Sequence, residues 1–288
     1  MKGPVQWHPA PFLCPGVELR GSGRGSPLES MSVGTLVAGP QAPLLERYSE
    51  DAVGILDAAE RRRLFDAAGT ARDERQLAWE LLYRIEPALY AELVAGERLH
   101  DGILGWLPSE CDHVLEIGAG TGRLTVDLAR RSASVTAVEP ALPMHDLLRD
   151  RLRRAGADRV QVVRGFFDEI PAPQRAHDLV ISCSAFAQHT LDDPDACLDM
   201  MESRCAPGGL LVLVWPWDAP WLRSRGFEHV VFEGPMVVEY ESLDSALALA
   251  RIFYPHAVAT IAARGSRFVD YTDLGLNAPR DLCWKRCV

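Results

Sequence analysis

The chain has 288 residues, of which 48% are apolar and 24% are charged. This composition is typical of a folded globular protein and excludes a collagen-like or wholly disordered chain. The formal net charge is −10, from 40 acidic and 30 basic residues, so nucleic acid is a poor first partner to expect. The longest apolar run is about seven residues, at 210–216, whereas a membrane helix needs roughly 20.

The cysteines and the N-terminus favour a cytoplasmic protein. The first residues lack the basic segment and apolar core of a signal peptide. The seven cysteines are odd in number, scattered, and without a C-x-x-C pair, which argues for reduced thiols and against a disulfide framework. His100, His113 and His256 have no metal-ligand spacing, so we expect no bound metal.

Two regions precede the first predicted strand. Residues 1–43 hold seven prolines and seven glycines and lack periodicity, so we expect a disordered tail. An alternative is that translation starts at Met31 and residues 1–30 are not part of the native protein. Residues 44–105 are predicted to form a helical cap or lid: one helix over 44–56, then an amphipathic stretch that Pro87 breaks or kinks.

Short apolar runs alternate with helical patterns after residue 105. Helices are expected near residues 121–131, 142–154 and 194–204. Alternating strands and helices predict a parallel sheet with right-handed crossovers, and therefore an α/β domain over residues 106–288. The predicted strands are 113–117, 134–138, 160–164, 179–183 and 210–215.

The last 70 or so residues alternate less clearly. Segments 229–233 and 236–241 flank a Gly-Pro pair and predict a hairpin. Ser242 is expected to cap a helix that reaches about residue 252. Two late strands are expected at 267–272 and 282–286.

A glycine-rich loop follows the first predicted strand. Residues 113–131 read HVLEIGAGTGRLTVDLARR, which predicts a strand, a tight turn and a helix. Glycines at 118, 120 and 122 allow a sharp turn and a close approach of a ligand to the backbone, at the strand end where open α/β sheets bind ligands. Arg123 stands where a nicotinamide-dinucleotide motif needs its last glycine, and no lysine completes a P-loop. One strand later, Glu139 ends the run VTAVEP and is expected to accept hydrogen bonds from both hydroxyls of a ribose.

The sequence resembles the class I S-adenosylmethionine-dependent methyltransferases over roughly residues 80–288. The segments VLEIGAGTG (114–122), AVEP (137–140), DLVISCS (178–184) and APGGLLVL (206–213) occur in that family's order and at its usual spacing. The resemblance implies a doubly wound, mostly parallel seven-stranded sheet of the Rossmann-like methyltransferase type, with an N-terminal helical cap. It also implies S-adenosylmethionine as the cofactor and S-adenosylhomocysteine as the product.

The resemblance also implies positions for the cofactor. Gly118, Gly120 and Gly122 would hold the methionine part, with Glu116 supporting the turn and Cys183 bordering the methionine arm. Glu139 would bind the ribose, and Pro140 would lie near the adenine. The family often has Gly-Asp after the third strand, whereas this chain has GFFD at 165–168. Phe166 and Phe167 would then hold the adenine by ring contact, or Asp168 would reach it instead.

His189, in the loop after the fourth strand, is the candidate general base, because that loop borders the methyl group in the family. Methyl transfer is an in-line displacement, so a base is needed only where the nucleophile must lose a proton. Tyr83 and Tyr90 lie on the predicted lid, and Tyr90 is a candidate for lining the active site.

The aromatic-rich segment 215–240 is expected to be an insertion that binds a small apolar or aromatic substrate. Arg223 and Arg225 within it could meet a carboxylate or face water. The predicted activity is methyl transfer to an O, N, S or C atom of a small molecule, with neither nucleic acid nor membrane as partner. Two alternatives stay open: transfer of another group of the same cofactor, such as aminocarboxypropyl, and a non-catalytic cofactor-binding partner protein. The oligomeric state and the substrate are not predicted.

Overall fold

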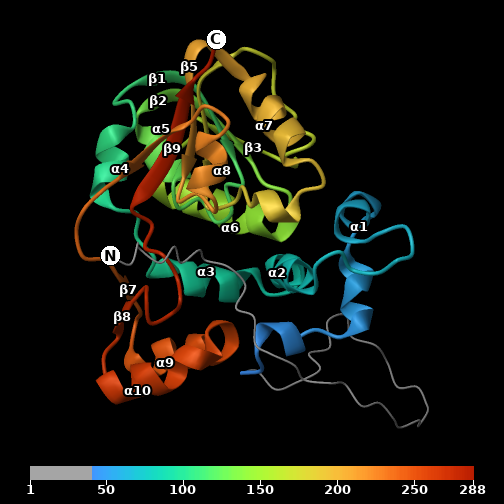
Figure 1. Ribbon diagram of the computed structural model, residues 1–288, viewed down its shortest axis with the longest axis vertical. Coiled ribbons are helices and arrows are strands. Elements are labelled where there is room, and N and C mark those ends of the chain that lie inside the picture. Colours follow the sequence, from blue (N-terminus) through green and yellow to red (C-terminus); the bar gives the residue numbers. More distant parts are fainter. Residues whose placement is uncertain (1–40) are drawn as a thin grey trace.

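The computed structural model describes residues 41–288, and within them a seven-stranded sheet dominates the fold (Figure 1). Its strand order is β3-β2-β1-β4-β5-β9-β6. Strands β1 to β5 pair in parallel, whereas β9 pairs antiparallel with both β5 and β6. This is the doubly wound, mostly parallel sheet that the sequence predicts. The strands are β1 (Cys111–Ile117), β2 (Ser132–Val138), β3 (Val160–Val163), β4 (His177–Cys183), β5 (Cys205–Val214), β6 (Glu228–Val231) and β9 (Asp281–Arg286).

The central strands are buried on both faces. In β5, Leu211 belongs to one buried cluster and the next residue, Val212, belongs to the other. A strand covered on both sides needs an apolar residue at nearly every position, which explains the run LLVLV at 210–214. The helices that follow the strands are α5 (Thr125–Arg130), α6 (Leu142–Ala155), α7 (Pro194–Glu202) and α8 (Ala219–Arg223), and a 3₁₀ turn, η3, spans Gln188–Thr190.

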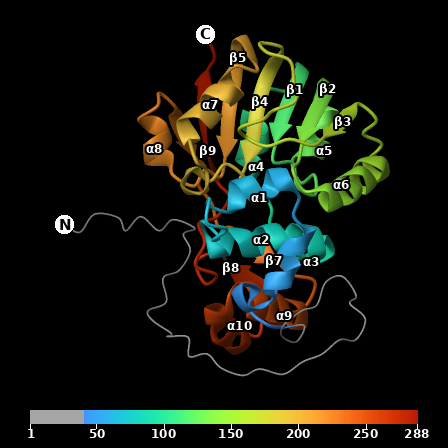
Figure 2. The same cartoon turned by 90° about the vertical axis from the view of Figure 1, so that its right-hand side faces the viewer.

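The N-terminal helices lie across one end of the sheet. Figure 2 shows α1, α2 and α3 at the end toward which the parallel strands run. Asp57 and Asp73 cap α1 and α2 through their carboxylates, and Pro87 begins α3, so the helical stretch breaks where the sequence predicts. The elements here are η1 (Leu44–Glu46), η2 (Glu50–Ile55), α1 (Ala58–Leu64), α2 (Glu74–Ile85), α3 (Pro87–Ala95) and α4 (Asp101–Trp106).

A smaller layer lies beyond α2 and α3, on the side away from the sheet (Figure 1). It contains a two-stranded sheet and two helices, with Ser242 capping the first helix as expected. The layer's elements are β7 (Val237–Glu239), α9 (Leu243–Phe253), η4 (Pro255–Ala257), α10 (Val258–Arg264) and β8 (Phe268–Asp270).

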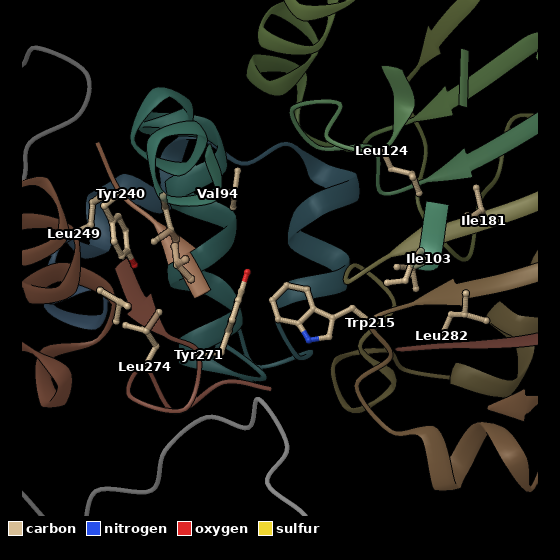
Figure 3. Close-up of a cluster of buried hydrophobic side chains, with 14 of the residues drawn as sticks. Val94, Ile103, Leu124, Ile181, Trp215, Tyr240, Leu249, Tyr271, Leu274 and Leu282 are labelled. Carbon is tan, nitrogen blue, oxygen red and sulfur yellow. The ribbon is translucent and has the colours of Figure 1, made fainter. Parts of the chain in front are cut away.

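One buried cluster joins this layer to the main sheet. Figure 3 shows Trp215, at the end of β5, facing Tyr271, which follows β8. Their ring centroids are 6.1 Å apart in an edge-to-face arrangement. The same cluster contains Val94 of α3 and Leu249 of α9, so the small layer and the lid share a core with the sheet.

The hairpin predicted at 229–241 is wrong. Strand β6 pairs with β9 at the edge of the main sheet, whereas β7 pairs with β8 in the small layer. Alternation along a segment predicts a strand but does not identify its partner. Here the partner residues lie 50–56 positions later for β6 and 29–33 positions later for β7. The predicted insertion at 215–240 is likewise shared between two sheets. Strand β6 within it is the edge strand of the main sheet, whereas β7 belongs to the small layer, which continues to β8.

The single helix predicted over 44–56 is also wrong, because two 3₁₀ helices, η1 and η2, occupy this segment. Between them, Arg47 and Tyr48 turn toward Glu86, with an Nη2–Oε1 distance of 2.7 Å and an OH–Oε2 distance of 2.8 Å. These long-range contacts favour a bent path over a continuous helix. The tail predicted at 1–43 lies, except for its last three residues, outside the described part of the chain. Among the described helices, none combines the length and apolarity needed to cross a membrane.

Candidate active site

The glycine loop is packed tightly at its first position. The backbone N–H groups of Gly118 and Ala119 both donate to the carbonyl of Val138, at 2.9 and 3.0 Å, which ties the end of β1 to β2. Gly118 has φ +76°, and a Cβ there would lie 2.3 Å from the Cβ of Ala185. Glycine is therefore required on both conformational and steric grounds.

Gly120 is different, because its surroundings are open. It also has a left-handed backbone, with φ +55°, but a Cβ built on it would meet no atom within 4 Å in residues 41–288. Its N–H donates to Oε2 of Glu139 at 2.9 Å. The loop therefore presents a bare stretch of backbone beside a carboxylate. At Gly122, by contrast, a Cβ would lie 2.5 Å from Leu148, so this glycine serves packing against α6.

Glu139, directly after β2, is buried with 5% of its surface exposed. Its second oxygen accepts the N–H of Ala141 at 2.9 Å, and His145 contacts its backbone carbonyl at 2.8 Å. Burial raises the pKa of Glu139 to about 7, although the two backbone hydrogen bonds oppose the shift. A polar carboxylate is thus held in a fixed position next to the glycine loop.

A small cavity of about 30 Å³ opens beside the loop, between β1, β4 and α3. Glu116 lies in its wall, and its Oε2 finds no hydrogen-bond partner among the described residues. Burial raises the pKa of Glu116 to about 8. The residues that line the cavity are Tyr90, Val94, Glu116, Gly118, Ala119, Gly120, Thr121, Arg123, Leu124 and Cys183.

The lid reaches the neighbouring Pro140 through Arg164. The Nε of Arg164 donates to the carbonyl of Pro140 at 3.1 Å, and its guanidinium binds the carboxylates of Asp57 and Glu60 at the start of α1. Glu60 in turn binds Arg84 of α2 at 2.9 Å. This chain of ion pairs fixes α1 and α2 over the end of β2.

The Phe166–Phe167 pair contacts the lid on one side and the glycine loop on the other. The guanidinium carbon of Arg63, on α1, lies 3.8 Å from the centroid of the Phe166 ring. Arg63 also donates to the Asp168 carboxylate at 2.9 Å, so this carboxylate is already engaged by the lid. Phe167 approaches the loop, because its Cζ would lie 3.9 Å from a Cβ on Gly118.

Arg123 lies between the cavity and Trp215. In the sequence this residue serves only to exclude a dinucleotide motif. Its Nη1 donates to Oε2 of Glu97 at 3.0 Å, and its Nη2 lies 3.9 Å from the sulfur of Cys183. Its guanidinium carbon is 5.8 Å from the Trp215 ring. The pKa of Glu97 is raised by burial, against the attraction of Arg123. No motif in the sequence marks Glu97 as a functional residue. Arg123 could have been predicted as a site residue, because it directly follows the last glycine of the loop.

The candidate catalytic residues lie at different places. Tyr90 lines the cavity and stacks edge to face with Tyr83, at a centroid distance of 4.9 Å. His189 lies in η3, outside the set of cavity-lining residues, with its ring 5.1 Å from that of Trp217. Burial lowers the pKa of His189, which keeps the imidazole neutral at pH 7. Arg225 pairs with Asp195 of α7 and is not one of the residues that line the cavity. The described residues contain no cluster of acidic, histidine or cysteine side chains suited to a metal ion.

Comparison with known proteins finds a methyltransferase domain within the chain. Residues 114–209 match the family described as a methyltransferase domain. An uncharacterized methyltransferase of Geobacillus kaustophilus is 27% identical over 190 residues, covering 62% of this chain and 83% of that protein. One from Mycobacterium tuberculosis is 36% identical over 127 residues, covering 43% of this chain and 49% of that protein. A solved S-adenosylmethionine-dependent methyltransferase of Aquifex aeolicus aligns with 81% of this chain and all of its own, at 15% identity and a TM-score of 0.40.

Residues 114–209 are thus a methyltransferase domain, and the sheet around them has the doubly wound order that the sequence predicts from its resemblance to class I S-adenosylmethionine-dependent methyltransferases. The matched residues include the glycine loop, Glu139 and Cys183, which are positions where the sequence predicts S-adenosylmethionine to bind. The residues present fit that cofactor on three counts: the open space beside Gly120, the unpaired oxygen of Glu116 in the described cavity wall, and the buried carboxylate at the end of β2.

Proposed function

We propose that the protein methylates a small molecule at the carboxyl ends of β1, β2 and β4. The observation that carries the proposal is the Gly120–Glu139 contact, which sets open backbone and a buried carboxylate beside one cavity. S-adenosylmethionine supplies an electrophilic methyl group, which an O, N, S or C atom of the substrate takes by in-line displacement. The protein's own contribution is to hold the two reactants and exclude water.

The proposed cofactor contacts follow from the residues of the cavity and the strand ends. Gly118, Gly120 and Gly122 shape the loop for the methionine part, Glu116 supports the turn, and Cys183 borders the arm. Glu139 accepts hydrogen bonds from the ribose hydroxyls, a role that its position at the end of β2 supports. Pro140, Phe166 and Phe167 form the proposed adenine wall.

The lid has a proposed role in excluding water. Helix α3 contributes Tyr90 and Val94 to the cavity, and Arg164 ties α1 to the Pro140 carbonyl. A closed, dry site strengthens the electrostatic interactions inside it. His189 is the proposed base for a substrate that must lose a proton, acting from the loop after β4 with a neutral imidazole.

A small-molecule substrate is favoured by two features. The cavity is narrow, at about 30 Å³, and α3 contributes part of its wall, so a folded macromolecule could not enter it. The net charge of −10 disfavours nucleic acid. We expect the reaction to be methyl transfer, because nothing in the described side chains favours transfer of another part of the cofactor.

The test combines binding and transfer. Calorimetry should detect S-adenosylhomocysteine binding to the parent protein, and Glu139→Gln should weaken it. Methyl-labelled S-adenosylmethionine, incubated with the protein and a set of small aromatic and heterocyclic nucleophiles, should give a labelled low-molecular-weight product. Absence of S-adenosylhomocysteine binding would overturn the cofactor site, and label recovered only in protein or RNA would overturn the small-molecule substrate.

A further inference from the structure

Two free cysteines meet at the end of the main sheet that lies away from the lid. Cys205 begins β5, and Cys287 directly follows β9, which pairs antiparallel with β5. Figure 2 shows this end of the sheet on the side away from α1 and α2. Both cysteines belong to one buried cluster, and only 2% and 3% of their surfaces are exposed. The pair therefore lies apart from the proposed methylation site.

Two glycines of β5 bring the cysteine side chains together. The N–H of Cys287 donates to the carbonyl of Gly209 at 2.9 Å, and the N–H of Gly208 donates to the carbonyl of Cys287 at 2.8 Å. Cys287 thus lies across from both glycines, as in a β-bulge. A Cβ built on Gly209 would lie 2.9 Å from the sulfur of Cys205, so this sulfur fills the space that the glycine leaves opposite Cys287. The sequence has no C-x-x-C pair, and only the fold places these two thiols side by side.

The two thiols differ in reactivity because they hydrogen-bond to each other. The Cys205 thiol donates to the sulfur of Cys287, which lowers the pKa of Cys287 below the usual 9.0. Burial and Glu202 oppose this shift, whereas Lys285 and Arg175 support it. The same hydrogen bond, together with burial, raises the pKa of Cys205. Cys287 is therefore the stronger nucleophile of the pair.

The pair lies close to solvent although both sulfurs are covered. Val288, the neighbour of Cys287, is 98% exposed, and Gly208 across from it is exposed as well. A Cβ on Gly208 would meet no atom within 4 Å among residues 41–288. A local opening of this strand end would uncover Cys287, and such openings cost far less than global unfolding.

We propose that Cys205 and Cys287 form a redox modification site, where exchange with a low-molecular-weight disulfide joins them in a reversible disulfide bond. The Cys287 thiolate attacks one sulfur of that disulfide, which forms a mixed disulfide and releases a first thiolate. The Cys205 thiol gives its proton to the released thiolate, and its sulfur then attacks Cys287 and displaces the second thiolate. In total, two protein thiols lose two protons and two electrons, and the small disulfide is reduced to two thiols.

The test incubates the reduced protein with oxidised glutathione, alkylates the remaining thiols and maps the linked peptides by mass spectrometry. We expect a Cys205–Cys287 cross-link in most chains, which dithiothreitol reverses. Because the bond closes a long loop between β5 and β9, the oxidised protein should melt about 5–10 °C higher. Absence of a cross-link, a linkage that involves another cysteine, or an oxidised protein that melts no higher than the reduced one would overturn the inference.

Single variants test the roles of the two sulfurs. Cys205→Ala should stop at a mixed disulfide of glutathione on Cys287, whereas Cys287→Ala should leave Cys205 at least tenfold less modified. Cys283→Ala is the matched control, because Cys283 lies on β9 in the same buried cluster, with 0% exposed, and should form the cross-link as the parent does. Equal modification of the two single variants, or loss of the cross-link in the control, would contradict the assigned pair. The peptide map of the parent protein decides the pairing even where a variant fails to fold.

Discussion

The backbone N–H of Gly120 donates to Oε2 of Glu139 at 2.9 Å, which joins the loop after β1 to the residue that ends β2. The carboxylate is therefore part of the loop's own hydrogen bonding as well as a candidate ribose ligand. Because Glu139 is only 5% exposed, its charge state depends strongly on its surroundings. Cofactor affinity and stability should therefore depend on pH, and cofactor binding should be sensitive to substitution of Gly120.

We expect S-adenosylhomocysteine affinity to rise with pH through about 7. Burial raises the pKa of Glu139 from 4.5 to about 7, and hydrogen bonds from ribose hydroxyls favour the ionised form. Below pH 7 Glu139 must lose a proton before the cofactor product binds. The dissociation constant should therefore rise by up to about tenfold for each pH unit below 7. Calorimetry in buffers of different ionisation enthalpy should detect proton release on binding. An affinity that is flat from pH 6 to 8 would contradict this assignment.

The same shift predicts how stability responds to pH. Between about pH 4.5 and 7 the folded, cofactor-free protein binds more protons at Glu139 than the unfolded chain does, so its stability should fall as pH rises across this range. Glu116, with a pKa of about 8, should extend the decline to higher pH. Glu139→Gln should remove the share of the decline that Glu139 contributes between about pH 4.5 and 7, and leave the share of Glu116, which runs from about pH 4.5 to 8. Melting temperatures of both proteins across this range give the test.

Gly120→Ala should abolish cofactor binding while the protein still folds. The new methyl group would stand in the open space that we assign to the cofactor, and the left-handed backbone would add about 1 kcal/mol of strain. Gly156→Ala is the matched control, because Gly156 has φ +64° and similarly meets no atom within 4 Å in the described chain, but lies at the end of α6. Both variants should lose the same few degrees in melting temperature. Equal S-adenosylhomocysteine affinity in the two would contradict the cofactor position.

Arg123 and Glu97 should show strong coupling in a double-mutant cycle. Arg123→Met leaves the buried carboxylate of Glu97 without its partner, and loss of one member of a buried ion pair costs about 3–5 kcal/mol. Glu97→Gln should cost a similar amount for the converse reason. The double variant should be less destabilised than the sum of the two, by more than about 1 kcal/mol. Additive free energies of unfolding in urea would mean that the pair acts independently.

The sequence predicted most of what local patterns can specify. Each of the five parallel strands, the glycine loop and Glu139 has a local signal in the sequence. The structure has all five strands at the predicted places, with ends that differ by at most two residues except at the start of β5, which begins five residues early. The pairing of β6 with β9 had no such signal, because the partner residue of Val230 is Leu282. Glu97 also could not be found, since a single glutamate after a helix becomes notable only when folding brings it to Arg123.

The prediction for Phe166 and Asp168 was limited for a related reason. The GFFD segment departs from the family pattern, and the residues alone left ring contact and Asp168 as alternatives. The lid decides what these side chains contact in the folded chain: Arg63 covers the Phe166 ring and binds the Asp168 carboxylate. Neither contact has a sequence signal, because Arg63 lies about 100 residues earlier on a helix predicted only as part of a cap.

His189→Ala should lower turnover by about 10²–10⁴ while leaving S-adenosylhomocysteine affinity nearly unchanged, if His189 acts as the base that we propose. Burial lowers its pKa below 6.5, so the unprotonated form prevails at neutral pH and turnover of the parent should rise with pH through that lowered value, then level off. His113→Ala is the control and should leave turnover unchanged. His113 is exposed at the end of β1 away from the cavity, and its ring hydrogen-bonds to the hydroxyl of Ser134. The ring of His189 packs against Trp217 and does not line the cavity, so lost cofactor contacts would not account for a drop in turnover of the variant. A variant within a few-fold of the parent, with the same pH profile, would remove His189 from the reaction and leave positioning of an already deprotonated nucleophile as the mechanism.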